Sequence, residues 1–324
     1  MKVLISGGAG FIGSNYVRMI ADGRLSGYSE VTVVDKLTYA GVVSNLERAK
    51  KMQGYSFIQG DICDVNLVRS LISNVDHVIN FAAESHVDRS ISASDDFVNS
   101  NIVGVQVILD AIKLRSDPVR LLQVSTDEVY GSITKGSWDE ESPLLPNSPY
   151  SASKAAGELL AMSYFRTFGL DILVTRCSNN YGSHHFPEKL IPLLITNIIE
   201  GKKLPLYGDG TNIRDWLHVD DHCRAIHAVL TMGKSGNVYN IGGGRELSNL
   251  QVAKLILKFM GESESCLEYV KDRKGHDFRY SVNWSKIEKE LGYKPLVEFE
   301  FGLQETIDWY KSNTEWWKPL KMQL

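Results

Sequence analysis

The chain has 324 residues, of which 43% are hydrophobic and 23% charged, and its formal net charge is −4. This composition is typical of a soluble globular protein, and the acidic balance argues against nucleic acid or an anionic membrane as the main partner. No apolar run approaches the roughly 18 residues of a membrane span, and the first one is too short for a secretory signal. The four scattered cysteines include no CxxC pair, which favours reduced thiols in a cytoplasmic protein without a metal site.

Short β-type runs alternate with helical stretches through the first half of the chain. The expected strands are Lys2–Ser6, Val31–Asp35, Tyr55–Gln59, His77–Ala82, Val119–Ser125 and Asp171–Arg176. The expected helices are Asp64–Ser73, Asp95–Arg115 and, after Pro149, Tyr150–Phe168. Apolar strands separated by helices predict βαβ units, and therefore an α/β fold with a doubly wound parallel sheet of Rossmann type.

The alternation breaks after about residue 177, where turn-rich stretches separate isolated helices. One helix is clear, because Ser248 and Gln251 form a capping-box pattern ahead of apolar residues at helical spacing. We therefore expect a dinucleotide-binding domain over residues 1–177 that carries the catalytic residues. Residues 178–324 are expected to form a smaller mixed α/β part that binds substrate, with some segments returning to the first domain.

A GxxGxxG series, Gly7, Gly10 and Gly13, follows the first expected strand. Glycine allows a tight turn there and lets backbone N–H groups approach a pyrophosphate at a helix N-terminus. Asp35 ends the second strand, about 20 residues further on, where an acidic side chain can accept hydrogen bonds from the ribose hydroxyls. A carboxylate repels a 2′-phosphate, so the pattern predicts NAD rather than NADP. The alternative is a structural turn with an unrelated surface Asp35, and Lys36 beside it weakens the distinction.

Tyr150 and Lys154 lie four residues apart on an expected helix and therefore share one face. The ammonium of Lys154 could lower the pKa of the phenol, and a phenolate could take the proton of a substrate alcohol as hydride leaves. A YxxxK pattern also arises by chance in a chain with 14 tyrosines. Its position after a strand favours function, because ligands of doubly wound sheets bind beyond the carboxyl ends of the strands.

The strand Val119–Ser125 runs into Thr126-Asp127-Glu128. Thr126 can form a hydrogen bond with a substrate hydroxyl. Two adjacent acids are most simply an acidic surface turn, but this pair is expected in the same crevice as the glycines and Tyr150. Neighbouring carboxylates shift each other's pKa apart, which suits one acid and one base.

These motifs together resemble the extended short-chain dehydrogenase/reductases and, within them, the dTDP-glucose 4,6-dehydratases. The acids Asp127 and Glu128 carry the subfamily assignment, because related epimerases lack the pair. Further matching segments span nearly the whole chain: Asp35–Tyr39, Asp61-Ile62, Ala82–His86, Thr126–Gly131, Tyr150–Lys154, Ser178–Tyr181, Pro187–Pro192, Arg214–Trp216 and Asp272–His276.

The resemblance implies a reaction and a set of site residues. Tyr150 would take the C4 hydroxyl proton, Glu128 would remove the C5 proton, and Asp127 would protonate the departing C6 hydroxyl, with NAD recycled within the cycle. The implied cofactor-binding residues are Gly7, Gly10, Phe11, Ile12, Gly13, Asp35, Lys36, Leu37, Thr38, Asp61, Ile62, Ala82, Ala83, Ser85, Tyr150, Lys154 and Asn180. The implied substrate-binding residues are His86, Thr126, Asn179, Lys189, Leu190, Pro205, Tyr207, Arg214, Asn249, Arg273, His276 and Tyr280.

Two other functions stay open: a nucleotide-sugar 4-epimerase or decarboxylase on the same fold, and a non-catalytic NAD-binding regulator, against which the intact catalytic set argues. The family also implies a homodimer. Val42, Ser183 and Lys274 depart from the commonest family pattern, and Lys274, with the short loop after Gly131, resembles enzymes of antibiotic deoxysugar pathways more than those of cell-wall rhamnose pathways.

Three histidine and tryptophan patterns are interpreted as structural. His218 and His222 lie four residues apart but lack a third metal ligand, so we expect a helix start capped by Asp220 or Asp221. The pair His184-His185 is expected in a loop near the substrate, and Trp316-Trp317 is expected to pack against the body of the protein.

Overall fold

The computed structural model describes residues 1–323 and contains a parallel seven-stranded sheet of order β10-β6-β5-β4-β1-β2-β3. These strands are β1 (Lys2–Ser6), β2 (Glu30–Asp35), β3 (Tyr55–Gln59), β4 (His77–Asn80), β5 (Arg120–Thr126), β6 (Ile172–Cys177) and β10 (Val238–Ile241). The predicted α/β fold and its six strands are confirmed, with bounds shifted by at most two residues. The largest shift is at β4, which ends at Asn80 because the next two residues turn into the pocket described below.

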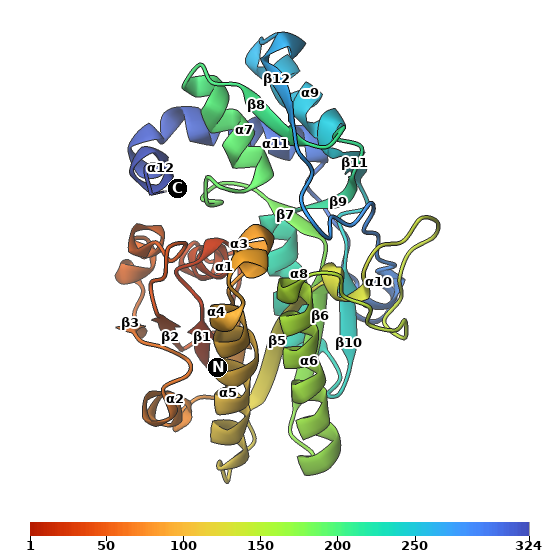
Figure 1. The fold of residues 1–324 in the computed structure, drawn as a ribbon. Helices are drawn as coiled ribbons and strands as arrows, with labels where there is room; N and C mark the ends of the chain where they lie inside the picture. Colours follow the sequence, from red (N-terminus) through yellow and green to blue (C-terminus); the bar gives the residue numbers. More distant parts are fainter. Residues whose placement is uncertain (324) are drawn as a thin grey trace.

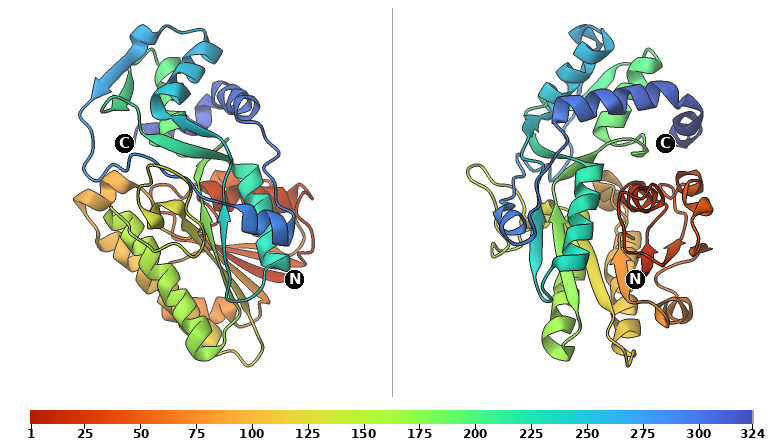
Figure 2. Two further views of the ribbon diagram at one scale, coloured as in Figure 1. Left: turned by 90° about the vertical axis from the view of Figure 1, so that its right-hand side faces the viewer. Right: turned by 180° about the vertical axis from the view of Figure 1, so that it is seen from behind.

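Helices cover both faces of the sheet (Figures 1 and 2). One face packs against α2 (Val65–Ile72), α5 (Gly104–Lys113) and α6 (Pro149–Phe168). The other face packs against α1 (Phe11–Ala21), α8 (Val219–Met232) and α10 (Ser285–Leu291). Burial on both sides explains why the strands are almost continuously apolar.

The long helix predicted over Asp95–Arg115 is confirmed from Asp95 to Lys113, with a π-helical turn inside it. It consists of α4 (Asp95–Val98), a π-helical turn η3 (Asn99–Val103) and α5. The Asn101 side chain accepts from Glu84 N at 3.0 Å and donates to Ser153 Oγ at 2.8 Å, so tertiary hydrogen bonds hold the wider turn in place. The short helices before it are η1 (Val43–Leu46), η2 (Ala49–Lys51) and α3 (Val87–Ser92).

The C-terminal part has its own apolar core and two small sheets. The strands are β7 (Asn179–Tyr181), β9 (Ile213–His218) and β11 (Glu246–Ser248) in one sheet, and β8 (Leu204–Tyr207) and β12 (Leu267–Val270) in the other. Its helices are α7 (Leu190–Ile199), α9 (Asn249–Met260), η5 (Glu264–Cys266), α11 (Phe299–Ser312) and α12 (Thr314–Lys321). It lies above the carboxyl ends of the large sheet in Figure 1, while β10, from the same half of the chain, extends that sheet beside β6.

Two predicted helix starts have different outcomes. The capping box of α9 is confirmed, since Ser248 Oγ accepts from Gln251 N while the Gln251 side chain accepts from Ser248 N. The predicted cap of α8 is wrong: His218 itself is the N-cap, and its Nδ1 accepts from Asp220 N at 3.3 Å. Asp221 instead accepts from Leu296 N and Val297 N, because it is buried against that segment. Among the described residues, no helix is both long and apolar enough to cross a membrane.

Candidate functional site

The glycine turn between β1 and α1 can be formed only by glycine at two of its three predicted positions. Gly7 has a φ of 69°, and a Cβ there would lie 2.4 Å from Ala82 N. A Cβ at Gly13 would lie 2.4 Å from the carbonyl oxygen of Gly7. Gly10 is the N-cap of α1 and no side chain caps this helix, so its first N–H groups are available to an anion. The turn therefore fits the pyrophosphate of a dinucleotide.

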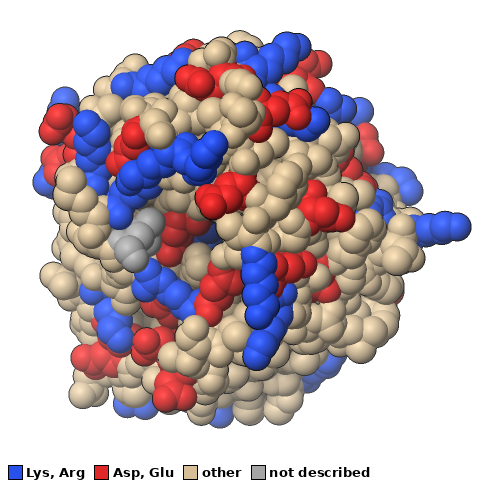
Figure 3. All heavy atoms as spheres, turned by 45° about the horizontal axis from the view of Figure 1, so that its top comes forward, with Lys and Arg blue, Asp and Glu red and all other residues tan. Residues whose placement is uncertain are grey.

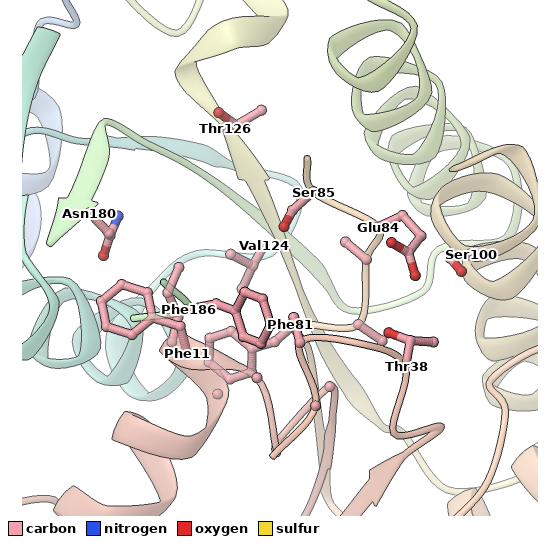
Figure 4. A pocket seen from close by; sticks show the side chains of 18 of the residues that line it. Phe11, Thr38, Phe81, Glu84, Ser85, Ser100, Val124, Thr126, Asn180 and Phe186 are labelled. Atoms are coloured by element: carbon pink, nitrogen blue, oxygen red, sulfur yellow. The ribbon is translucent and has the colours of Figure 1, made fainter. Parts of the chain in front are cut away.

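A pocket at the carboxyl ends of the strands joins this turn to the predicted catalytic residues. It encloses about 1660 Å³, part of it open to solvent. Figure 4 shows Phe11 and Thr38 from the cofactor side, and Thr126 and Asn180 further along the wall. Figure 3 shows acidic and basic side chains around a hollow on the face that lies at the top of Figure 1.

All but one of the predicted cofactor residues line this pocket; Leu37 packs against the apolar core instead. Asp35 accepts from Ala9 N at 2.9 Å and from Leu37 N at 2.8 Å, which orients its carboxylate at the end of β2. Burial raises its pKa, although these hydrogen bonds oppose the shift. Lys36 pairs with Asp61 at 2.8 Å, so its charge is partly neutralised beside the pocket.

Tyr150 and Lys154 both line the pocket from the first turns of α6. The helix starts here because Ser148 caps it, accepting from Ser151 N at 3.1 Å, and Pro149 occupies the first helical position. The predicted lowering of the Tyr150 pKa by Lys154 is not found in the structure. Lys154 Nζ donates to Val124 O at 2.7 Å, and burial raises the pKa of Tyr150, helped by the charge of Glu128. Burial also lowers the pKa of Lys154 to about 8.

The acidic pair occupies the turn η4 (Asp127–Tyr130) at the end of β5, and its two members have different surroundings. Asp127 is 2% exposed, and among residues 1–323 its Oδ2 has no hydrogen-bond partner. Burial raises the pKa of Asp127 well above its ordinary value, and the charges of Glu128 and Asp215 add to the shift. Glu128 is partly exposed and accepts from Ser151 Oγ at 3.2 Å. Burial therefore favours the protonated form of Asp127, and the pair is no surface turn.

The predicted nucleotide-binding residues centre on a buried guanidinium. Arg214 lies over the ring of Tyr280, 4.3 Å from its centroid, and donates to Ile213 O at 2.7 Å and to Asp277 O at 3.0 Å. The hydroxyl of Tyr280 donates to Asp277 Oδ2 at 2.6 Å. Arg214 therefore already has carbonyl partners, and burial lowers its pKa.

A second set of predicted substrate residues connects the C-terminal part to α3. Tyr207 donates to Asp88 Oδ2 at 3.1 Å, and Arg273 Nη1 lies 3.9 Å from Asp88 Oδ1. His276 pairs with Asp272 at 2.6 Å, and its ring lies edge-on to Tyr207. Arg273 and Tyr207, two of the residues predicted to bind substrate, thus contact a carboxylate on α3 and do not line the pocket.

The remaining predicted substrate residues are dispersed. Asn179 and Lys189 line the pocket, and Lys189 Nζ donates to Ser85 O at 2.9 Å. His86 Nε2 lies 3.7 Å from Glu188 Oε2. Leu190 packs against the C-terminal core, while Pro205 lies in β8 and Asn249 begins α9, so none of these three reaches the pocket.

Several pocket residues were not predicted. Glu84, Ser100, Phe186 and Glu188 all line it, and Glu188 was present in a matching segment without an assigned role. His184 and His185, expected near the substrate, line the wall where His185 stacks on Phe11 with 4.0 Å between ring centroids. The ring-bearing residues His184, His185 and Phe186, which follow Tyr181 at the end of β7, were the sequence feature that could have indicated this wall.

The histidines His218 and His222 and the tryptophans Trp316 and Trp317 have partners within the protein. His222 Nδ1 lies 2.9 Å from Asn180 Oδ1, a pocket residue, and His218 caps α8. Within the described residues there is no cluster of three side chains that could hold a metal. Trp317 is fully buried, so the expected packing is confirmed there. Trp316 is partly buried and donates to Asn45 Oδ1 at 2.9 Å.

Comparison with known proteins identifies the family. Residues 4–306 match the family model described as GDP-mannose 4,6 dehydratase. The chain is 54% identical to a dTDP-glucose 4,6-dehydratase of Streptomyces niveus, over 99% of this chain and 96% of the relative. It is 43% identical to the Escherichia coli protein of the same name, over 98% and 96% of the two chains.

Solved structures agree with these relatives. A dTDP-glucose 4,6-dehydratase from Streptomyces venezuelae, solved with NAD bound, has a TM-score of 0.97 and 50% identity and covers 99% of this chain and 100% of its own. A UDP-glucose 4-epimerase from Thermotoga maritima has a TM-score of 0.88 but only 29% identity, over 97% and 100% of the two chains. The chain therefore belongs to the dTDP-glucose 4,6-dehydratase family of the extended short-chain dehydrogenase/reductases.

Proposed function

We propose that this protein converts dTDP-glucose to dTDP-4-keto-6-deoxyglucose in deoxysugar biosynthesis, with NAD recycled in each turnover. The observation that carries the proposal is the asymmetric acid pair. Asp127 is buried and its pKa is raised, while its neighbour Glu128 is partly exposed, and both line one pocket with the glycine turn and Tyr150. Removing water from C5 and C6 needs one base and one acid, and this pair supplies both.

The first step is oxidation at C4. Bound NAD⁺ supplies a hydride acceptor, a hydride donor for the return to C6, and a positive charge that favours the phenolate of a nearby tyrosine. Tyr150 takes the proton of the C4 hydroxyl. Lys154 holds its ammonium against Val124 O, 2.7 Å away, and so keeps a positive charge in the wall of the pocket. Thr126 offers a hydroxyl to the sugar from the end of β5.

Elimination follows because the new C4 ketone acidifies the C5–H bond. Glu128 removes the C5 proton. Asp127 gives its proton to the C6 hydroxyl, which leaves as water, and the C5–C6 double bond forms. Reduction at C6 and protonation at C5 then give the 4-keto-6-deoxy sugar. An epimerase needs no acid pair at this position, because it only reverses the configuration at C4.

The nucleotide is assigned to Arg214, Arg273, Tyr207, Tyr280 and Lys189. The guanidinium groups suit the diphosphate, since their planar forks match its oxygens. Arg273 lies close to the Asp88 carboxylate, and the Tyr207 hydroxyl donates to that carboxylate. A diphosphate would therefore compete with Asp88 for the same donors.

A homodimer is proposed through the helices on one face of the sheet. Val103 just before α5, Leu114 just after it, and Leu159 on α6 are apolar and exposed. Exposed apolar side chains gathered on neighbouring helices are typical of association surfaces. Light scattering should give twice the monomer mass, and Leu159→Glu should return it to the monomer value. We also place the protein in the cytoplasm, where its free thiols would stay reduced.

The reaction is tested by incubating the protein with dTDP-glucose and weighing the product. A mass lower by one water, with deuterium at C5 in D₂O and a C4 deuterium label recovered at C6, is the expected result. An unchanged mass with galactose configuration would make the protein an epimerase. The base is tested with C5-deuterated substrate, because Glu128→Gln should slow the washout of deuterium; washout at the wild-type rate would refute its role.

A further inference from the structure

A short loop after β7 forms one wall of the cofactor side of the pocket. His184, His185 and Phe186 all line this wall. The ring of His185 lies almost parallel to that of Phe11, with 4.0 Å between centroids and 12° between planes. Phe11 is the first residue of α1, whose N-terminus faces the predicted pyrophosphate. The loop therefore touches the very element that would hold the dinucleotide.

The loop does not hold this conformation alone. His184 has a φ of 63°, in the left-handed region that residues other than glycine rarely adopt. Its ring packs against two indoles that also contact each other, 4.3 Å from the centroid of Trp309 and 5.5 Å from that of Trp316. The hydroxyl of Tyr310 donates to the carbonyl of His185. The loop is thus held from outside by α11 and α12, and these contacts offset its backbone strain.

The same C-terminal segment is also tied to the first domain. Trp316 Nε1 donates to Asn45 Oδ1 at 2.9 Å, and Asn45 Nδ2 donates to Ala9 O, in the glycine turn, at 3.3 Å. Asn45 is only 2% exposed, so this amide is held firmly. In Figure 1, α12 lies directly above the segments of the first domain that surround the glycine turn. Trp316 therefore connects the loop on one side of the pocket with the glycine turn on the other.

The end of α12 has a firm anchor in the C-terminal part. Trp317 is fully buried and its Nε1 donates to Tyr310 O at 2.8 Å. Lys321 Nζ donates to Asn197 Oδ1 at 2.7 Å and lies 2.9 Å from Glu200. Because both ends of the connection are fixed to rigid elements, breaking it in the middle should loosen the pocket wall without unfolding either part.

We propose that Trp316, through His184 and Asn45, is a positioning residue that slows the release of NAD. Trp316 does not line the pocket, so it acts through the loop and the glycine turn. The inference rests on the proposed function, in which reduced cofactor formed at C4 must remain until it is used at C6. Cofactor lost between these steps would leave the enzyme with an oxidised substrate and no hydride, so retention is part of the cycle.

The test measures the release of labelled NAD from the holoenzyme after addition of excess unlabelled NAD. Trp316→Phe keeps a ring beside His184 but loses the hydrogen bond to Asn45, and release should be about three- to tenfold faster. Trp316→Ala loses both contacts, and release should be on the order of 10- to 100-fold faster. Trp284→Phe, a tryptophan that packs against Tyr293 and does not line the pocket, is the matched control and should release NAD at the wild-type rate.

Two further measurements separate retention from general damage. Asn45→Ala also loses the hydrogen bond to Ala9 O, so it should release NAD at least as fast as Trp316→Phe. The double variant should release NAD no faster than Asn45→Ala alone, because the bond between Trp316 and Asn45 is already absent there. During turnover without added NAD, Trp316→Ala should lose activity progressively, and added NAD should restore it. Melting curves check that each variant is folded. If Trp316→Ala is unfolded, the test uses Trp316→Phe alone.

Release within twofold of wild type in both Trp316→Phe and Trp316→Ala would overturn the proposal. That result, with NAD bound and the 4-keto product formed, would leave the proposed function intact. A wild-type protein that binds NAD but forms no keto product would instead contradict the function, whatever the release rates.

Discussion

The proposed reacting end of the site, at Asp127, and its proposed nucleotide end, at Arg214 and Tyr207, differ in how their polar groups are satisfied. At the reacting end, Asp127 is buried with an oxygen atom that, within residues 1–323, lacks a hydrogen-bond partner, and its pKa is raised before any substrate arrives. At the nucleotide end, Arg214 and Tyr207 already have protein partners, backbone carbonyls for one and the Asp88 carboxylate for the other. One carboxylate oxygen of the proposed acid Asp127 thus lacks a partner among the described residues, whereas Arg214 and Tyr207 are hydrogen-bonded within the protein.

This difference predicts how the two ends respond to substitution. Groups whose protonation is set by burial act on bond making and breaking, so their loss should appear in kcat. A group that exchanges a protein partner for a substrate partner contributes only the difference between the two interaction free energies. Substituting such a group should therefore have a smaller effect, and the effect should appear in KM.

The largest effect is expected for Tyr150→Phe. Loss of the proton acceptor at C4 should lower kcat by on the order of 10³-fold, while bound NAD is retained. The measurement is the rate of keto-sugar formation together with the NAD content of the purified variant. Tyr164→Phe, on the same helix but bonded to Asp110, is the matched control and should keep wild-type activity. Equal losses in both variants would mean that the helix, rather than the Tyr150 phenol, had been damaged.

Asp127→Asn should lower kcat by on the order of 10²-fold, because the amide cannot give its proton to the C6 hydroxyl. The C4 oxidation does not need this proton, so reduced cofactor should accumulate and be visible by its absorbance. Asp139→Asn, an exposed acid of the following loop, is the control. Wild-type turnover in Asp127→Asn would show that Asp127 is not the acid that protonates the C6 hydroxyl.

The same substitution should raise stability at neutral pH. In the unfolded chain the carboxyl titrates near its ordinary pKa of about 3.9, whereas the folded protein holds this proton to a much higher pH. Folding then binds a proton over that range, so the free energy of unfolding of the wild type falls as pH rises. Asparagine does not titrate, and the variant's melting temperature should gain on that of the wild type between about pH 4 and pH 7. A constant difference over this range would contradict the raised pKa.

Arg214→Lys tests the nucleotide end. The ammonium keeps the charge but loses the planar fork, so KM for dTDP-glucose should rise by about 10- to 100-fold while kcat changes little. Initial rates over a range of substrate concentrations separate the two constants. Arg279→Lys, an arginine that pairs with Glu246 outside the pocket, is the control. A fall in kcat with an unchanged KM would mean that Arg214 acts in the chemical steps, and that the two ends do not differ in this respect.

The two ends also differ in how far the residues could be predicted. The glycine turn and the start of α6 were predictable because local rules decide them: Gly7 needs a positive φ, and Ser148 with Pro149 starts a helix. The partner of Lys154 was not, since the Val124 carbonyl comes from another element. The π-helical turn at Asn101 and the return of β10 to the large sheet likewise depend on contacts between segments far apart in the chain. Asp127 was expected in the crevice because it follows β5, but its burial was not predicted, and Asp88 carried no local signal.

Asp88→Asn therefore gives the smallest and sharpest test of the contrast. If Asp88 competes with a diphosphate for Arg273 and Tyr207, removing its charge should tighten the binding of dTDP by about two- to fivefold, the range expected of one partly exposed ion pair. Isothermal titration at two salt concentrations measures this, and the gain should shrink as salt screens the charges. Asp272→Asn is the matched control, because its carboxylate pairs with His276 and not with Arg273 Nη1 or the Tyr207 hydroxyl. Weaker binding in Asp88→Asn would mean that this carboxylate positions the two donors for the nucleotide rather than competing with it, and the nucleotide end would then be prepared in advance like the reacting end.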